Sequence, residues 1–65
     1  MNPLQITITP TMLTFHEVPD EVLVKLVERY VIDVNGKGRH YIKGTPEQLF
    51  KALLELSYSY DLEIS

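Results

Sequence analysis

The side chains of this chain that could bind a metal or move a proton begin with its two histidines, His16 and His40. The two lie far apart in the sequence, neither has the i, i+4 histidine spacing of a helical zinc site, and the chain contains no cysteine. We therefore predict no metal site and no cofactor, and we expect both histidines to be surface or half-buried residues.

Two pairs of acidic residues could suggest acid–base chemistry, but each is better explained by structure. Asp20 and Glu21 stand at a predicted helix start, where negative charge favours the positive end of the helix dipole. Asp61 and Glu63 alternate along a predicted strand and would share its solvent face. No serine or threonine has an evident partner base. We predict no catalytic residue and no enzyme, and a small enzyme is the least favoured class.

A basic hairpin is the strongest candidate for a binding site. Half of the six lysines and arginines lie at residues 37–43, and residues 34–45 contain no acid. The turn sequence Asn35-Gly36-Lys37-Gly38 predicts a β-hairpin. The alternative function is thus a nucleic-acid-binding regulator that uses residues 35–43, with contacts from Lys37, Arg39, His40, Tyr41 and Lys43. The competing interpretation is a solvated turn whose charges keep the hairpin soluble.

Length and charge limit the remaining classes of function. The 65 residues make one domain, residues 1–65, and a domain of this size buries only about 60% of its unfolded surface. Without cysteine it needs very good packing or a partner. The net charge of −3 argues against general attraction to nucleic acid or to an anionic membrane. We expect a cytoplasmic protein that does not bind membranes.

The hydrophobic periodicity predicts strands and helices in alternation. Period-2 patterns predict strands, and apolar residues at helical spacing, preceded by proline and acidic or capping residues, predict helices. The predicted elements are strands at 4–9 and 11–16, a helix at 19–29, strands at 30–34 and 39–43, a helix at 45–56 and a strand at 57–65.

The order of these elements indicates two copies of a strand–helix–strand unit. The helices overlay on a shift of about 27 residues, and the strands that follow them overlay on a shift of about 30. The predicted fold is α+β and ferredoxin-like, βαββαβ, with two helices on one face of a small antiparallel sheet and residues 4–9 as an additional N-terminal edge strand. A winged-helix fragment and a ribbon-helix-helix dimer are the alternatives.

The predicted function is a small, non-enzymatic interaction or regulatory module that acts as a homo-oligomer or on a partner protein. Residues 4–9 carry no charge, so nothing would discourage an edge strand there from pairing with another chain. The predicted interface residues are Leu4, Ile6, Ile8, Tyr30 and Tyr60. The predicted solvent face of the last strand carries Ser57, Ser59, Asp61 and Glu63, so any nucleic acid should bind at the hairpin and not across the sheet.

Overall fold

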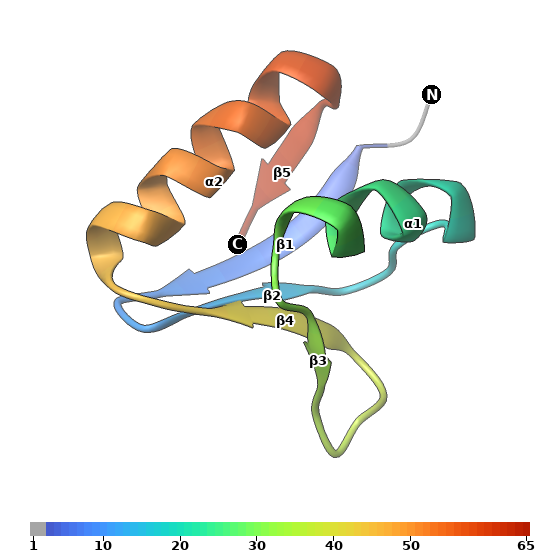
Figure 1. The fold of residues 1–65 in the computed structure, drawn as a ribbon, viewed down its shortest axis with the longest axis horizontal. Coiled ribbons are helices and arrows are strands. Elements are labelled where there is room, and N and C mark those ends of the chain that lie inside the picture. Colours follow the sequence, from blue (N-terminus) through green and yellow to red (C-terminus); the bar gives the residue numbers. More distant parts are fainter. Residues whose placement is uncertain (1–2) are drawn as a thin grey trace.

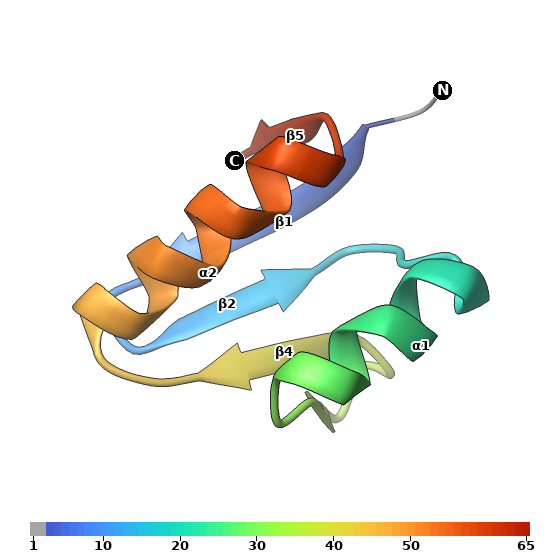
Figure 2. The same cartoon turned by 45° about the horizontal axis from the view of Figure 1, so that its top comes forward.

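The computed structural model describes residues 3–65 as a five-stranded sheet with two helices on one face (Figures 1 and 2). The strand order is β3-β4-β2-β1-β5, and all neighbours are antiparallel except β1 and β5, which are parallel. The elements are β1 (Leu4–Thr9), β2 (Met12–Phe15), α1 (Asp20–Arg29), β3 (Asp33–Val34), β4 (His40–Lys43), α2 (Pro46–Ser59) and β5 (Leu62–Ile64).

Both helices begin where the sequence predicts. α1 starts directly after Pro19, and Asp20 and Glu21 occupy its first turn. α2 has a complete capping box: the Gln48 backbone N–H donates to Thr45 Oγ1 at 3.2 Å, and the Thr45 backbone N–H donates to Gln48 Oε1 at 3.0 Å. The capping box satisfies N–H groups that the start of α2 would otherwise leave without partners.

The hairpin between β3 and β4 is held by the side chain of Asn35 as well as by backbone hydrogen bonds. Asn35 Oδ1 accepts from the backbone N–H of Lys37 at 2.8 Å and from that of Arg39 at 3.0 Å. Gly38 has φ +77°, a left-handed conformation that suits glycine. The predicted turn is confirmed.

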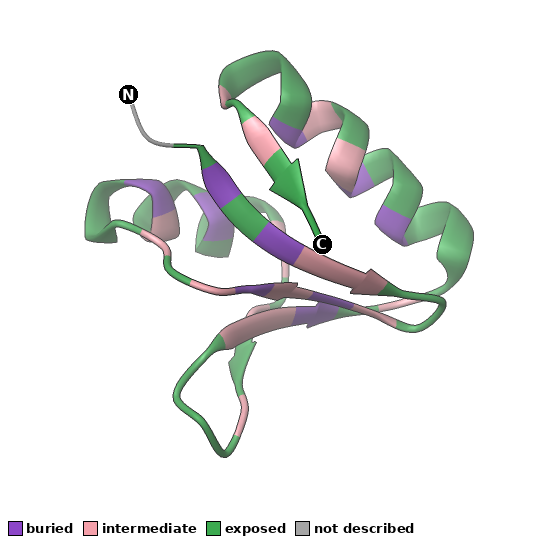
Figure 3. Cartoon of the chain, turned by 180° about the vertical axis from the view of Figure 1, so that it is seen from behind, coloured by how far each residue is buried: buried purple, intermediate pink, exposed green. Residues whose placement is uncertain are grey.

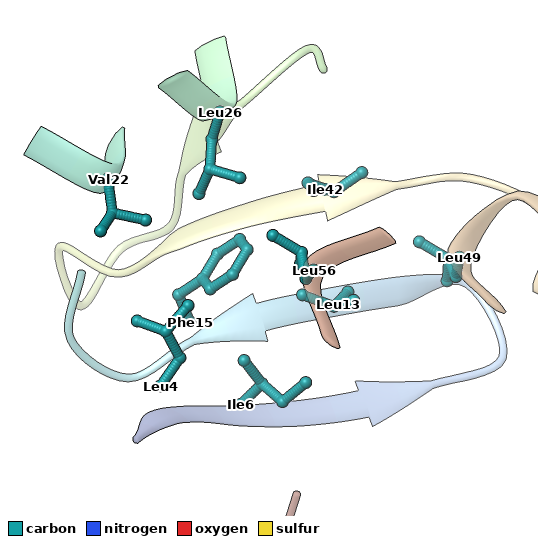
Figure 4. Close-up of a cluster of buried hydrophobic side chains, with 9 residues drawn as sticks. All are labelled: Leu4, Ile6, Leu13, Phe15, Val22, Leu26, Ile42, Leu49 and Leu56. Carbon is teal, nitrogen blue, oxygen red and sulfur yellow. The ribbon is translucent and has the colours of Figure 1, made fainter. Parts of the chain in front are cut away.

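The core lies between the helices and one face of the sheet (Figures 3 and 4). Its most deeply buried large side chains are Ile6, Leu13, Phe15 and Leu49. Because side chains alternate along a strand, the other face of the sheet is left open. The buried residues are Leu4, Ile6, Leu13, Phe15, Val22, Leu26, Ile42, Leu49, Ala52 and Leu56.

The α+β class is confirmed, but the predicted edge position of residues 4–9 is wrong. β1 lies inside the sheet, hydrogen-bonded to β2 on one side and to β5 on the other. It separates β2 from β5 and makes the sheet mixed, so the exact four-stranded antiparallel ferredoxin-like arrangement is not confirmed. The physical reason is burial: an interior position covers both Leu4 and Ile6, which an edge would leave partly in water.

Two predicted strands are shorter than expected. The alternation from Ser57 to Ser65 predicts one strand, yet α2 runs through Ser59 and only Leu62–Ile64 are in β5. Ser57 lies inside the helix, where its Oγ donates to the Leu54 carbonyl at 2.6 Å, and the helix ends at Tyr60, whose backbone N–H donates to the Leu56 carbonyl. Similarly, the predicted strand at 30–34 is reduced to the two residues of β3, because Tyr30 caps α1 through its backbone N–H.

Candidate functional site

The residues predicted as an interface are part of the core or pack against it. Leu4 is 6% exposed and Ile6 is fully buried, while Ile8, Tyr30 and Tyr60 are half-buried against the core. Both Leu4 and Ile6 belong to the core cluster of this chain, and their contact with another chain stays a prediction.

Tyr30 links the two helices through its hydroxyl. Its hydroxyl donates a short hydrogen bond to Glu55 Oε2, and Arg29 Nη2 lies 3.6 Å from the same oxygen. Burial of the phenol, then the hydrogen bond and the negative charge of Glu55, raise the pKa of Tyr30 to about 12. This cluster stabilises the packing of α1 beside α2.

The free edge of the sheet beside α2 is β5. The Leu4 backbone N–H donates to the Asp61 carbonyl at 2.8 Å, and the Ser65 N–H donates to the Ile6 carbonyl at 3.0 Å. Since alternate residues of a strand direct their backbone groups to opposite sides, Leu62 and Ile64 direct theirs away from β1. No other strand of residues 3–65 pairs with this side.

An apolar groove of about 340 Å³ runs along this edge, between α2 and β5. Phe50 is 64% exposed, Leu54 45% and Ile64 53%, although all three are large apolar side chains. Asp61 is the charged residue of its lining, which is completed by Leu53, Ser57, Tyr60 and Leu62. β5 ends the sheet beside α2 (Figure 1), so the free edge and the apolar groove lie together.

This surface was not predicted, because apolar residues at helical spacing in the predicted helix at 45–56 indicate a buried face. The sequence does contain a signal for this surface, because the apolar stripe of the helix is wider than one buried face. The stripe consists of Leu49, Phe50, Leu53, Leu54 and Leu56. In the structure Leu49 and Leu56 face the core, while Phe50 and Leu54 face the groove.

The basic hairpin residues do not form one cluster. Tyr41 and Lys43 lie on the open face of the sheet, whereas His40 shares the other face of β4 with the buried Ile42. Arg39 and His40 line a hollow of about 500 Å³ together with His16. Glu17 lines the same hollow. Lys37 lies in the exposed turn.

The last strand contributes fewer residues to the open face than predicted, because Ser57 and Ser59 belong to α2 and β5 begins after Asp61. Its middle row runs across three strands through Thr7, Thr14 and Tyr41, and it ends at Asp33. Uncharged side chains therefore occupy the centre of this face, with acids on the outer strands.

A threonine–histidine pair on this face was not predicted. Thr7 Oγ1 lies 2.6 Å from His16 Nε2 and 3.3 Å from Ser65 Oγ. A nucleophile and base in catalysis also need an oriented histidine and donors for the developing oxyanion. Within residues 3–65 no further side chain is hydrogen-bonded to His16, so the pair is explained by pairing between β1 and β2.

The described part of the chain holds no group of three histidine, aspartate or glutamate side chains that could bind a metal ion. Neither helix within residues 3–65 is both long and apolar enough to cross a membrane. No protein-family model, curated protein sequence or solved structure matches the chain.

Proposed function

We propose that this protein is a non-enzymatic interaction module that binds an extended segment of a partner protein at β5. The bound segment adds a strand to the sheet and lies against α2. The observation that carries the proposal is the coincidence of a free strand edge with an exposed apolar groove lined by Phe50, Leu54 and Ile64.

Both components of strand addition are present at this surface. In this binding mode, main-chain hydrogen bonds supply affinity and pockets for alternate side chains supply specificity. Leu62 and Ile64 offer outward backbone groups, and the groove offers an apolar surface for every second residue of the partner. Clustered apolar residues at a surface are typical of interaction sites.

The other free edge, at β3, is a poorer template. β3 has two residues, and the Asn35 backbone N–H donates inward to the Arg39 carbonyl at 2.9 Å. Val34 is therefore the residue of this strand that directs its backbone groups outward. Exposed valines of α1 and of the segment after it could supply apolar contacts near this edge. The β3 edge, however, offers one residue for main-chain pairing with a partner.

The proposal is tested with a short peptide that alternates valine and serine, titrated into the full chain and followed by the amide resonances. We expect the largest shifts at Leu62, Ile64 and the groove side of α2. Ile64→Pro removes one outward N–H without removing a hydrogen bond to β1, so it should abolish these shifts while the fold is retained.

Val34→Pro is the matched control, since Val34 is 55% exposed and Ile64 53%, and both direct their N–H groups outward at an edge. It should leave peptide binding unchanged. Binding that survives Ile64→Pro, or that is lost in Val34→Pro, would show that β5 is not the docking edge.

The basic hairpin supports a second candidate, contact with nucleic acid. Among residues 3–65 the ion pair found is Arg29–Glu55, so Lys37, Arg39 and Lys43 have no carboxylate partner. Binding should weaken steeply with salt and be lost in Lys37→Glu with Arg39→Glu. The matched control, Lys25→Glu with Lys51→Glu, changes the same charge on the helices. Salt-independent binding, or equal loss in both double variants, would contradict this candidate.

A further inference from the structure

We infer that the segment bound at β5 alternates apolar residues with lysine or arginine. This inference rests on the proposed function and names the chemistry of the partner. It is carried by the charges beside the edge, by the direction of the β5 side chains, and by the unfavourable charge pairing that a second copy of this chain would meet.

Within residues 3–65, the charged residues that line the two hollows beside β5 are acidic. Asp61 lines the apolar groove. Glu63 lines a second hollow, whose other lining residues are Pro3, Gln5 and Glu17. In the described part of the chain, no lysine or arginine lines either hollow. A strand placed here meets the apolar groove with Asp61 in its lining on one side, and Glu63 and Glu17 on the other.

The alternation of β5 decides which partner residues meet which surface. Leu62 and Ile64 are directed to the helix side, so the partner residues beside them face Phe50 and Leu54 across the groove. Glu63 is directed to the open side. The partner residue opposite Glu63 would lie about 5 Å from it between Cβ atoms, and an opposite charge at that position is favourable.

A second copy of this chain is a poor occupant of the edge. Two β5 strands could pair antiparallel about a two-fold axis. An axis at Glu63 places this residue opposite Glu63 of the second copy. An axis at Leu62 places Asp61 of one copy opposite Glu63 of the other. Like charges directly opposite each other are destabilising. Pairing centred on Ile64 avoids the clash, but it leaves Leu62 without a partner residue inside β5.

Three short peptides test the inference on the full chain: valine alternating with lysine, with serine, and with glutamate. We expect the lysine peptide to bind about three- to tenfold more tightly than the serine peptide, from one or two opposite-charge cross-strand pairs. The glutamate peptide should bind more weakly than both. The lysine preference should shrink as salt is added, because these charges are exposed.

Glu63→Lys should reverse the order of the lysine and glutamate peptides. Glu28→Lys makes the same change in charge on the exposed surface of α1 and should preserve the order. Equal binding of the three peptides at β5, or the same order in Glu63→Lys, would overturn the inference while leaving strand addition intact.

Failure of the proposed function gives a different result: none of the peptides shifts Leu62 or Ile64. A dimer in light scattering that is broken by Ile64→Pro would identify a second copy as the occupant, and it would also overturn this inference.

Discussion

Two isoleucines that face each other across neighbouring strands test the interior position of β1. Ile6 of β1 and Ile64 of β5 are register partners, yet Ile6 is fully buried and Ile64 is 53% exposed. Replacing each by alanine removes the same atoms from environments that differ mainly in burial. Ile6→Ala should therefore destabilise the fold much more than Ile64→Ala.

The expected costs follow from the two environments. Truncating a buried isoleucine to alanine typically lowers the free energy of unfolding by about 2–5 kcal/mol. Because Ile6 is completely buried, we expect Ile6→Ala to cost about 3–4 kcal/mol. Ile64 keeps half its surface in water, so its truncation should cost about 1 kcal/mol or less. A domain of this length has about 3–10 kcal/mol of total stability, so Ile6→Ala leaves it marginal.

Urea unfolding followed by circular dichroism measures both free energies. If Ile6→Ala proves too unstable to measure, Ile6→Val should cost about 1 kcal/mol and Ile64→Val close to none. Equal costs at the two positions, or a larger cost at Ile64, would refute the placement of β1 between β2 and β5.

Three further predictions concern the helix link, the hairpin and the cap. Because the folded pKa of Tyr30, about 12, lies above its ordinary value of 10.0, its contribution to stability should be present below pH 10 and lost as the pH rises towards 12. Tyr30→Phe should remove this pH dependence and cost about 1 kcal/mol at neutral pH, as urea unfolding measures; an unchanged profile would refute the link to Glu55. Gly38→Ala should cost about 1 kcal/mol and Gly36→Ala much less, because only Gly38 of the two has positive φ; equal costs would contradict this. Thr45→Ala should lower stability by about 1 kcal/mol in thermal or urea unfolding, and no change would show that the capping box is dispensable.

Local signals in the sequence predicted the elements better than their arrangement. The capping box at Thr45, the proline before α1 and the Asn35 turn each depend on residues within four positions, and all three are confirmed. The position of β1 depends on contacts with β5, at the far end of the sequence. Periodicity shows which face of a strand is buried, but it does not show which strands are its neighbours.

The candidate site was missed for a related reason. Phe50 and Leu54 are apolar and lie in a helix whose other face is buried, so the pattern assigns them to the core. Whether such residues are covered depends on how far the sheet extends beneath the helix. Here the sheet ends at β5, and the groove side of α2 remains exposed.

Amide hydrogen exchange with and without the uncharged valine–serine peptide tests strand addition at β5 most directly. The proposal predicts new protection at the amides of Leu62 and Ile64, the two that point away from β1, and no change at Val34 on the opposite edge. Protection at Val34 or at the 35–39 turn, or unchanged exchange at Leu62 and Ile64 when the peptide is bound, would contradict it.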